Sequence, residues 1–182
     1  MSMPAAVSRV EAVNMHVSRL ETPIGPMLAA TTDQGLCLLE FVDETRGDAR
    51  LEQMRAALGA VVVPGKSPIA ETLARELAAY FAGRGRSFSI PLHLCGTDFQ
   101  TQVWQGLQAI PYGQTRSYRE QAVAIGRPRA VRAVAQANRA NRIAIVIPCH
   151  RVIGADGHLV GYSAGLWRKQ RLLELEQGRP FG

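Results

Sequence analysis

Apolar residues in the first third of the chain form short runs that are separated by turn-forming residues. The runs cover residues 15–21, 25–31 and 35–42, and prolines, glycines and a Thr-Thr-Asp-Gln-Gly segment lie between them. Short apolar runs bounded by such residues are typical of β-strands. The pattern therefore predicts three antiparallel strands in a meander.

Helical periodicity follows at 47–58 and 67–82. In the second of these segments the apolar side chains recur at three- to four-residue spacing, at Ile69, Leu73, Leu77 and Tyr80. This spacing places them on one face of a helix. Residues 83–94 then predict a turn and a further strand.

The second half of the chain predicts mainly helices. Thr97 or Asp98 is a candidate N-cap for a helix that runs to Ile110, and two short helical patterns at 117–126 and 127–139 are joined through a glycine. Two short helices linked in this way are typical of a helix-turn-helix motif.

Charge divides the chain unequally. The net charge is +6, but residues 1–92 carry about −1 and residues 93–182 about +7. Between Arg116 and Arg151 there are eight arginines and one acidic residue, Glu120. Such a bias indicates either a polyanionic partner such as nucleic acid or a solvated arginine-rich surface, and charge alone leaves both open.

Bulk composition narrows the class of protein. With 182 residues and 47% hydrophobic residues the chain can bury a substantial core. No segment approaches the roughly 20 consecutive apolar residues of a membrane span, and the N-terminal segment lacks the apolar stretch of an export signal. The three cysteines contain no CxxC pair, which argues against a disulfide framework and a cysteine-based zinc site. The reducing cytoplasm is the expected location.

A reactive sequence follows an apolar run. The run at 143–147 predicts a core strand, and it leads directly into Pro148, Cys149, His150 and Arg151. A histidine or another positive charge favours the nucleophilic thiolate of a cysteine. Because neighbouring residues of an extended chain point to opposite sides, a bridging water or a turn after Pro148 would be needed to join the two side chains.

The histidine in turn needs an acceptor to orient it. The C-terminal helical pattern at 168–177 offers Glu174 or Glu176 for this role. The structural alternative is that Cys149 is a buried small apolar residue, which is also the interpretation of Cys37 and Cys95.

Four ordered motifs carry a resemblance to a known family. "IPYGQTRSY", "GRPRAVRAVAQANRAN", "IPCHRV" and "GYSAGLWRKQRLLELE" together closely resemble the O6-alkylguanine-DNA alkyltransferases, also called methylated-DNA–protein-cysteine methyltransferases. The resemblance is continuous from about Thr97 to Glu176. It extends more loosely to "TPIGPM" and "GLCLLEF" in the first half.

The resemblance implies a role for each residue of the catalytic group. Cys149 is expected to accept the alkyl group, His150 to take the thiol proton through a water, and Glu176 to orient His150. Tyr118 is expected to assist the leaving guanine and to turn the nucleotide. Arg132 is expected to enter the duplex and fill the gap left by the flipped base.

The resemblance also implies the surrounding pocket and the DNA contacts. Asn141 is expected as the hinge before the active-site segment, Ser163 as a contact to the guanine O6, and Tyr162 and the Val152 backbone as pocket lining. The other DNA-binding residues expected are Arg129, Arg139 and Arg151. Asn138 and Arg142 differ from some family members, which bears on how bulky an adduct the pocket accepts.

The expected fold is α/β, with two domains. Residues 1–92 are expected to form a ribonuclease H-like supporting domain, and residues 93–182 a helical domain with a winged helix-turn-helix. The expected partner is double-stranded DNA that contains O6-alkylguanine, with O4-alkylthymine as a possible second substrate, and the protein is expected to act once, as a monomer, without cofactor or metal. The alternatives are a lesion-binding module without transfer activity and a cysteine hydrolase with several turnovers.

Overall fold

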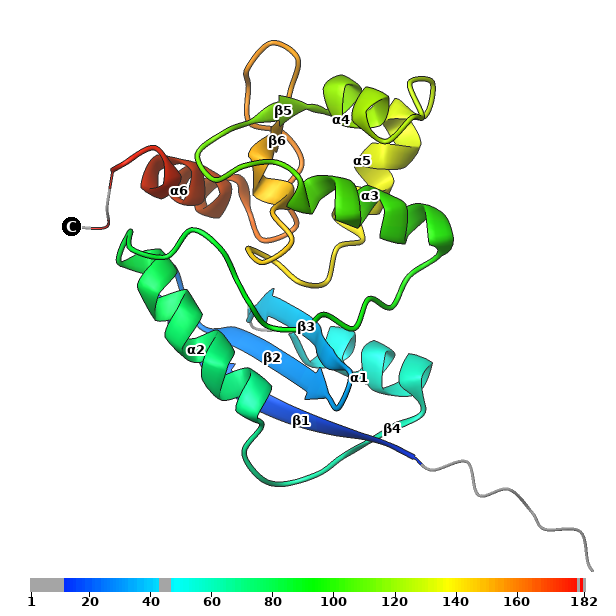
Figure 1. Cartoon of the computed structure of the whole chain (residues 1–182). Coiled ribbons are helices and arrows are strands. Elements are labelled where there is room, and N and C mark those ends of the chain that lie inside the picture. Colours follow the sequence, from blue (N-terminus) through cyan, green and yellow to red (C-terminus); the bar gives the residue numbers. More distant parts are fainter. Residues whose placement is uncertain (1–11, 43–46, 180, 182) are drawn as a thin grey trace, which may run out of the picture.

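The structure, a computed structural model, describes residues 12–42, 47–179 and 181 (Figure 1). It has a sheet domain at the N-terminal side and a helical domain at the C-terminal side. The prediction about an export signal concerns a segment that lies largely outside the described residues. None of the helices in the described ranges combines the length and apolar character that a membrane span requires.

The sheet domain contains the predicted meander. The strands β1 (Val13–Leu20), β2 (Met27–Thr32) and β3 (Gly35–Phe41) pair antiparallel in chain order. A fourth strand, β4 (Ala60–Val62), pairs parallel to β1 and gives the sheet order β3-β2-β1-β4. The sequence did not predict β4, because three residues are too few to show a strand pattern.

Two helices accompany this sheet, at the positions that the periodicity predicts. They are α1 (Gly47–Leu58) and α2 (Pro68–Phe81). Ser67 caps α2 by accepting a hydrogen bond from the amide of Ala70, and Pro68 occupies the first turn, where a missing N–H costs nothing. Leu73, Leu77 and Tyr80 are buried, as one apolar helix face requires.

The connection at residues 83–97 differs from its prediction. Its only β contact is an isolated bridge between Leu92 and Leu36, so it forms a turn and an extended linker rather than a strand. Gly35 allows this close approach, because a Cβ there would lie 2.5 Å from the carbonyl oxygen of Pro91.

The helical domain begins with α3 (Asp98–Gln108), which Thr97 and Gln100 start with a reciprocal capping box. The helix-turn-helix follows as α4 (Tyr118–Ala124) and α5 (Val131–Arg139), and α6 (Leu166–Glu176) ends the domain. Two short strands, β5 (Arg116–Ser117) before α4 and β6 (Val152–Ile153) before α6, pair in parallel with each other.

The apolar run at 143–147 is not a strand, which corrects the prediction. Only Ile143 makes a bridge, to Leu39, and the chain then turns, with the amide of Ile147 donating to the carbonyl of Ile143 at 3.0 Å. Ile145 has a φ of 71°, which is uncommon for a β-branched residue and is incompatible with a regular strand. Its side chain is nevertheless 1% exposed, so the turn buries the apolar residues that suggested a strand.

Candidate active site

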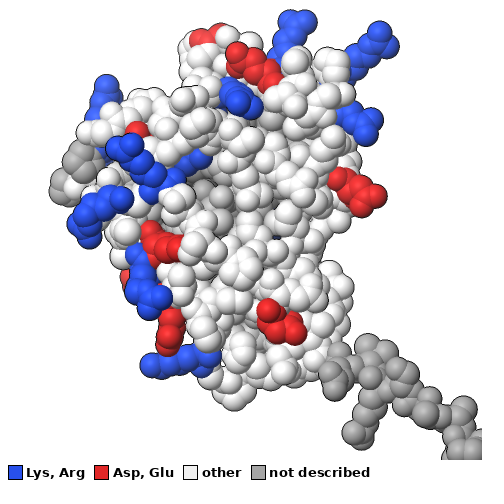
Figure 2. All heavy atoms as spheres, in the orientation of Figure 1, with Lys and Arg blue, Asp and Glu red and all other residues white. Residues whose placement is uncertain are grey.

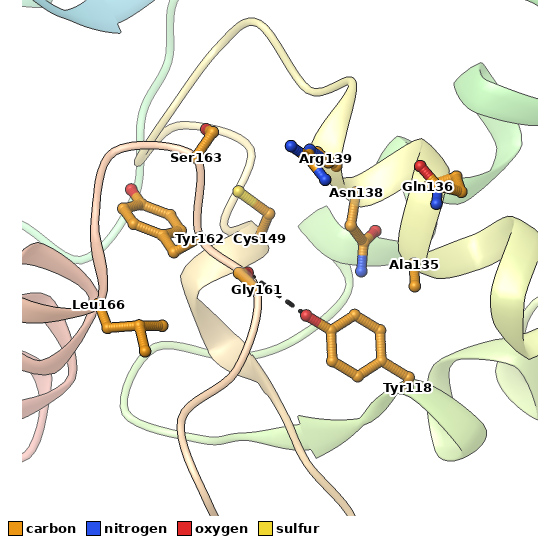
Figure 3. Close-up of a pocket in the computed structure, with 10 residues that line it drawn as sticks. All are labelled: Tyr118, Ala135, Gln136, Asn138, Arg139, Cys149, Gly161, Tyr162, Ser163 and Leu166. Atoms are coloured by element: carbon orange, nitrogen blue, oxygen red, sulfur yellow. Dashed lines mark hydrogen bonds between the residues drawn. The ribbon is translucent and has the colours of Figure 1, made fainter.

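Cys149 lies at the start of a single helical turn, η1 (Cys149–Arg151), which follows Pro148. Its thiol faces a cavity of about 480 Å³, and Figure 3 shows Tyr162 and Ser163 near the sulfur and Tyr118 across the cavity. Such a volume falls in the range of about 300–1,000 Å³ that is usual for ligand pockets. The other lining residues are Ala135, Gln136, Asn138, Arg139, Gly161 and Leu166.

Asn141 holds the turn that carries Cys149. Its Oδ1 accepts the amide of Ile143 at 2.9 Å, and its Nδ2 donates to the carbonyl of Ile147 at 2.9 Å and to Sγ of Cys149 at 3.3 Å. One buried amide thus satisfies two backbone groups of the turn and orients the thiol.

The pKa of the Cys149 thiol is raised by burial, and the hydrogen bond from Asn141 and the charge of Lys169 only partly oppose that effect. Lys169 is fully buried and donates from Nζ to the carbonyls of Val152 at 2.5 Å and Val160 at 2.6 Å. Burial lowers the pKa of Lys169 to about 8, against the influence of Cys149. The thiol is therefore protonated at neutral pH and requires a base before it can act as a nucleophile.

A suitable base lies in the same turn. His150 is fully buried, and its Nε2 lies 2.7 Å from Oε1 of Glu176. An ionised carboxylate can only accept, so Nε2 carries the proton and Nδ1 presents a lone pair. Nδ1 has no hydrogen-bond partner among the described residues.

Glu176 is the centre of a buried polar cluster. Its carboxylate accepts from Nε and Nη2 of Arg151 at 2.9 and 3.0 Å, from the amide of Gly113 at 3.0 Å and from the hydroxyl of Tyr80 at 2.8 Å. Burial alone would raise the pKa of Glu176, but the hydrogen bonds and charges of His150 and Arg151 outweigh it and hold that pKa well below the ordinary value. Burial in turn lowers the pKa of His150, against the influence of Glu176, so the imidazole is neutral and able to accept a proton.

The helix-turn-helix presents arginines to solvent. Arg129, Arg132 and Arg139 are all exposed, and Figure 2 shows basic side chains projecting from the end of the molecule where α4 and α5 lie in Figure 1. This exposed basic end suits a polyanion.

Tyr118, the first residue of α4, joins that surface to the cavity. Its hydroxyl donates weakly to the carbonyls of Val160 and Gly161, at 3.2 and 3.4 Å. The α4 helix is fixed at this point by a capping box between Ser117 and Glu120.

Both halves of the chain match one family of known proteins. Residues 15–94 match the ribonuclease-like domain of 6-O-methylguanine DNA methyltransferase, and residues 98–178 match the DNA-binding domain of the same family. A methylated-DNA–protein-cysteine methyltransferase of Methanosarcina barkeri is 49% identical over 90% of this chain and 98% of its own length. One from Mycobacterium leprae is 47% identical over 90% of this chain and 93% of its own.

The chain belongs to the 6-O-methylguanine DNA methyltransferase family. Its fold is that of solved members: the O6-methylguanine methyltransferase of Mycobacterium tuberculosis superposes with a TM-score of 0.78 at 43% identity, over 92% of this chain and 96% of that one. The OGT of the same organism in complex with DNA gives a TM-score of 0.76 at 43% identity, over 92% and 95% of the two chains. The α/β fold with a ribonuclease-like first domain and a helical second domain is confirmed.

For a methyltransferase of this family, two expected residues lie in other places than the sequence suggested. Arg151 is buried, with its guanidinium bound to Glu176 and to the carbonyl of Ile110, so it faces the interior rather than a DNA surface. Val152 is not among the residues that line the cavity, and its carbonyl accepts from Lys169 instead.

Several residues of this methyltransferase site were not found by sequence reasoning. Gly113 reaches Glu176 with its backbone amide, and the Lys169 side chain donates to the backbone carbonyl of Val152, so neither contact leaves a side-chain motif in the sequence. Tyr80 was assigned only to an apolar helix face, and its hydroxyl reaches Glu176 across 96 residues. The Asn138 side chain forms two hydrogen bonds with that of Gln121, at 2.7 and 3.0 Å, which explains how an amide is tolerated there. The one signal available in the sequence was Asn138 itself, a polar residue among the apolar residues that α5 buries.

Proposed function

We propose that this protein repairs DNA by transferring the alkyl group from O6 of guanine to Sγ of its own Cys149. The observation that carries the proposal is the position of Cys149 in a ligand-sized cavity beside a buried neutral histidine. Membership of the family and the names of the relatives support the same reaction.

The reaction begins with removal of the thiol proton. His150 takes that proton at Nδ1 through a bridging water, because the described hydrogen bonds do not join Sγ to Nδ1 directly. Glu176 stabilises the imidazolium that forms, and Lys169 and Asn141 stabilise the thiolate. This is the division of roles of a nucleophile, a base and an orienting carboxylate.

The alkyl transfer is a single displacement. The thiolate sulfur forms a bond to the alkyl carbon as the bond from that carbon to O6 breaks, and the electron pair of that bond stays with the guanine. The guanine takes up one proton, which balances the proton lost from Cys149. Tyr118 donates to guanine N3 as negative charge develops there. Its hydroxyl can leave the carbonyls of Val160 and Gly161 for N3, because those hydrogen bonds, at 3.2 and 3.4 Å, are long and weak.

DNA binding follows from the exposed arginines. The modified base leaves the duplex to reach Cys149, and Arg132 fills the gap because its planar guanidinium can stack and remain charged. Arg129 and Arg139 contact phosphates, so the affinity is salt-dependent and shows little sequence preference. Ser163 contacts O6 and the Tyr162 ring lines the cavity.

The product is stable, which sets how the protein works. A thioether is a poor leaving group, so each molecule acts once.

We further infer that the protein acts as a monomer on double-stranded DNA, with residues 1–92 and 93–182 as its two domains. Its three free cysteines suit the reducing cytoplasm.

The test is peptide mass spectrometry after mixing the protein with a duplex that contains one O6-methylguanine. The expected result is one methyl in place of one hydrogen on Cys149, saturating at one per protein. Cys149→Ser abolishes the gain, whereas the matched change Cys95→Ser, at a half-buried thiol that does not line the cavity, leaves it intact. Tight lesion binding with an unmodified Cys149 would instead indicate a binding module, and repeated turnover would indicate a hydrolase.

A further inference from the structure

The hydroxyl of Tyr80 belongs to the sheet domain but binds the centre of the catalytic cluster. It lies on α2 and donates to Oε1 of Glu176 at 2.8 Å. The same oxygen accepts from Nε2 of His150 at 2.7 Å and from Nη2 of Arg151 at 3.0 Å. Tyr80 and His150 therefore compete for the electron density of one carboxylate oxygen.

The surroundings of Tyr80 fix its hydroxyl in place. The residue is 1% exposed, and its ring packs edge-on against Phe81 and Tyr112 and at a tilt against Phe88, with ring centroids 5.4 to 6.0 Å apart. These rings come from α2, from the linker and from the loop after α3. A tyrosine held so tightly presents its hydroxyl at a defined position rather than filling space alone.

We propose that Tyr80 is a positioning residue for alkyl transfer: by sharing Oε1 of Glu176 it limits the basicity of His150 and keeps the imidazole neutral until Cys149 gives up its proton. The proposal rests on the proposed function, in which His150 is the base. It gives the N-terminal domain a part in the reaction beyond support of the fold.

The direction of the effect follows from the charges around His150. Arg151 and Lys169 face the imidazole and disfavour its protonated form, whereas Glu176 favours that form. The pKa values of Tyr112 and Tyr162 are raised mainly by burial, and the negative charge of Glu176 adds to this effect. All of these groups stay in place when the Tyr80 hydroxyl is removed. The carboxylate then interacts more strongly with His150, and more of the imidazole is protonated at mildly acidic pH, where it cannot act as a base.

The test uses Tyr80→Phe in the full chain. Alkylation of Cys149 by iodoacetamide, which releases iodide, is followed by peptide mass spectrometry from pH 5.5 to 9, and methyl transfer from an O6-methylguanine duplex is followed over the same range. Relative to wild type, both rates are expected to fall about fivefold at pH 6 and to stay within about twofold at pH 8.5, the order expected for loss of one hydrogen bond to a carboxylate. Tyr112→Phe is the matched control, because it removes a neighbouring hydroxyl that forms no hydrogen bond with the described residues, and its profile should follow that of wild type.

A second variant keeps the aromatic ring and is expected to shift the pH profile in the opposite direction. 3-Fluorotyrosine at position 80 retains the ring and makes the hydroxyl a stronger donor, so the acidic limb of both profiles should move to lower pH. In a Glu176→Gln background Tyr80→Phe should have no further effect on the profile, since the route through Glu176 is gone.

Three outcomes would overturn the proposal: an unchanged profile in Tyr80→Phe, an equal loss of rate at every pH together with a lower melting temperature, or a full Tyr80→Phe effect in Glu176→Gln. The iodoacetamide measurement needs no DNA. A wild-type protein that takes no methyl from the duplex would refute the proposed function, while the iodoacetamide profiles would still decide the role of Tyr80.

Discussion

Replacing Glu176 with glutamine isolates the charge of the buried cluster, because the two side chains have nearly the same shape. The side chain of Glu176 is 0% exposed and that of Arg151 is 9% exposed. Removing one partner of a buried ion pair leaves the other charge without compensation, which typically costs about 3–5 kcal/mol. The glutamine NH₂ group would also face donors of Arg151, Gly113 or Tyr80, so at least one present hydrogen bond is lost.

The expected loss is measurable by thermal unfolding. For a chain of this size about 1 kcal/mol corresponds to a shift of about 2–4 °C, so Glu176→Gln should melt about 6–20 °C below wild type. The single-turnover rate of methyl transfer should fall about 10²-fold or more, because His150 loses the group that orients it and stabilises its charge.

Glu174 on the same helix is the matched control. It pairs with Arg171 at 2.9 Å, and the Arg171 side chain is 40% exposed. Solvent-exposed pairs contribute about 1 kcal/mol or less, so Glu174→Gln should melt within a few degrees of wild type and transfer methyl normally. Equal melting temperatures for the two variants, or normal transfer by Glu176→Gln, would refute the reasoning.

Three further predictions concern the hinge, the DNA surface and pH. Asn141→Ala leaves the Ile143 amide and the Ile147 carbonyl without their partner and should lower the free energy of unfolding in urea by about 3 kcal/mol; a loss below about 1 kcal/mol would mean that the turn does not depend on Asn141. Arg132→Ala should slow methyl transfer from duplex DNA at least tenfold but leave alkylation of Cys149 by iodoacetamide unchanged. The control is Arg75→Ala, which removes an exposed arginine on α2 and should affect neither rate. An equal loss of rate in both assays would mean that Arg132 acts in the chemical step rather than in base flipping. Burial lowers the folded pKa of His150 from its ordinary 6.5, so below pH 6.5 the unfolded chain binds a proton that the folded chain does not. Stability in urea should then fall as pH drops from 6.5 toward the lowered folded value, and this slope should be absent in His150→Gln; the same slope in both proteins would show that another group is responsible.

Much of the fold is local in origin and was therefore predictable. The helix at α2 follows from apolar spacing together with the Ser67–Pro68 start, and α3 follows from the Thr97 cap. The chemistry of Cys149 and His150 could be predicted because the two residues are adjacent in the chain. The choice of Glu176 over Glu174 came from the family resemblance, since the residues alone left both open.

The parts that sequence reasoning missed depend on contacts that no local pattern records. The segment at 143–147 has the composition of a strand, but the positive φ of Ile145 and the bonds of Asn141 make it a turn. Arg151 was grouped with the DNA-binding arginines by charge, although a buried carboxylate from α6 neutralises it. A charge count cannot separate an arginine on the surface from one that is paired inside.

The catalytic cluster also bears on what each domain does. The main apolar core contains Leu73 and Leu77 of α2 together with Ile110 and Leu172 of the helical domain, so the two domains share one core. Tyr80 adds a hydrogen bond to this apolar interface, because its hydroxyl donates to the Glu176 carboxylate that also binds His150. A change in the packing of α2 that displaces Tyr80 therefore also alters the hydrogen bonding of the Glu176 oxygen that binds His150. The N-terminal domain then acts on the nucleophile through one buried carboxylate, and the reactivity of Cys149 depends on residues from both halves of the chain.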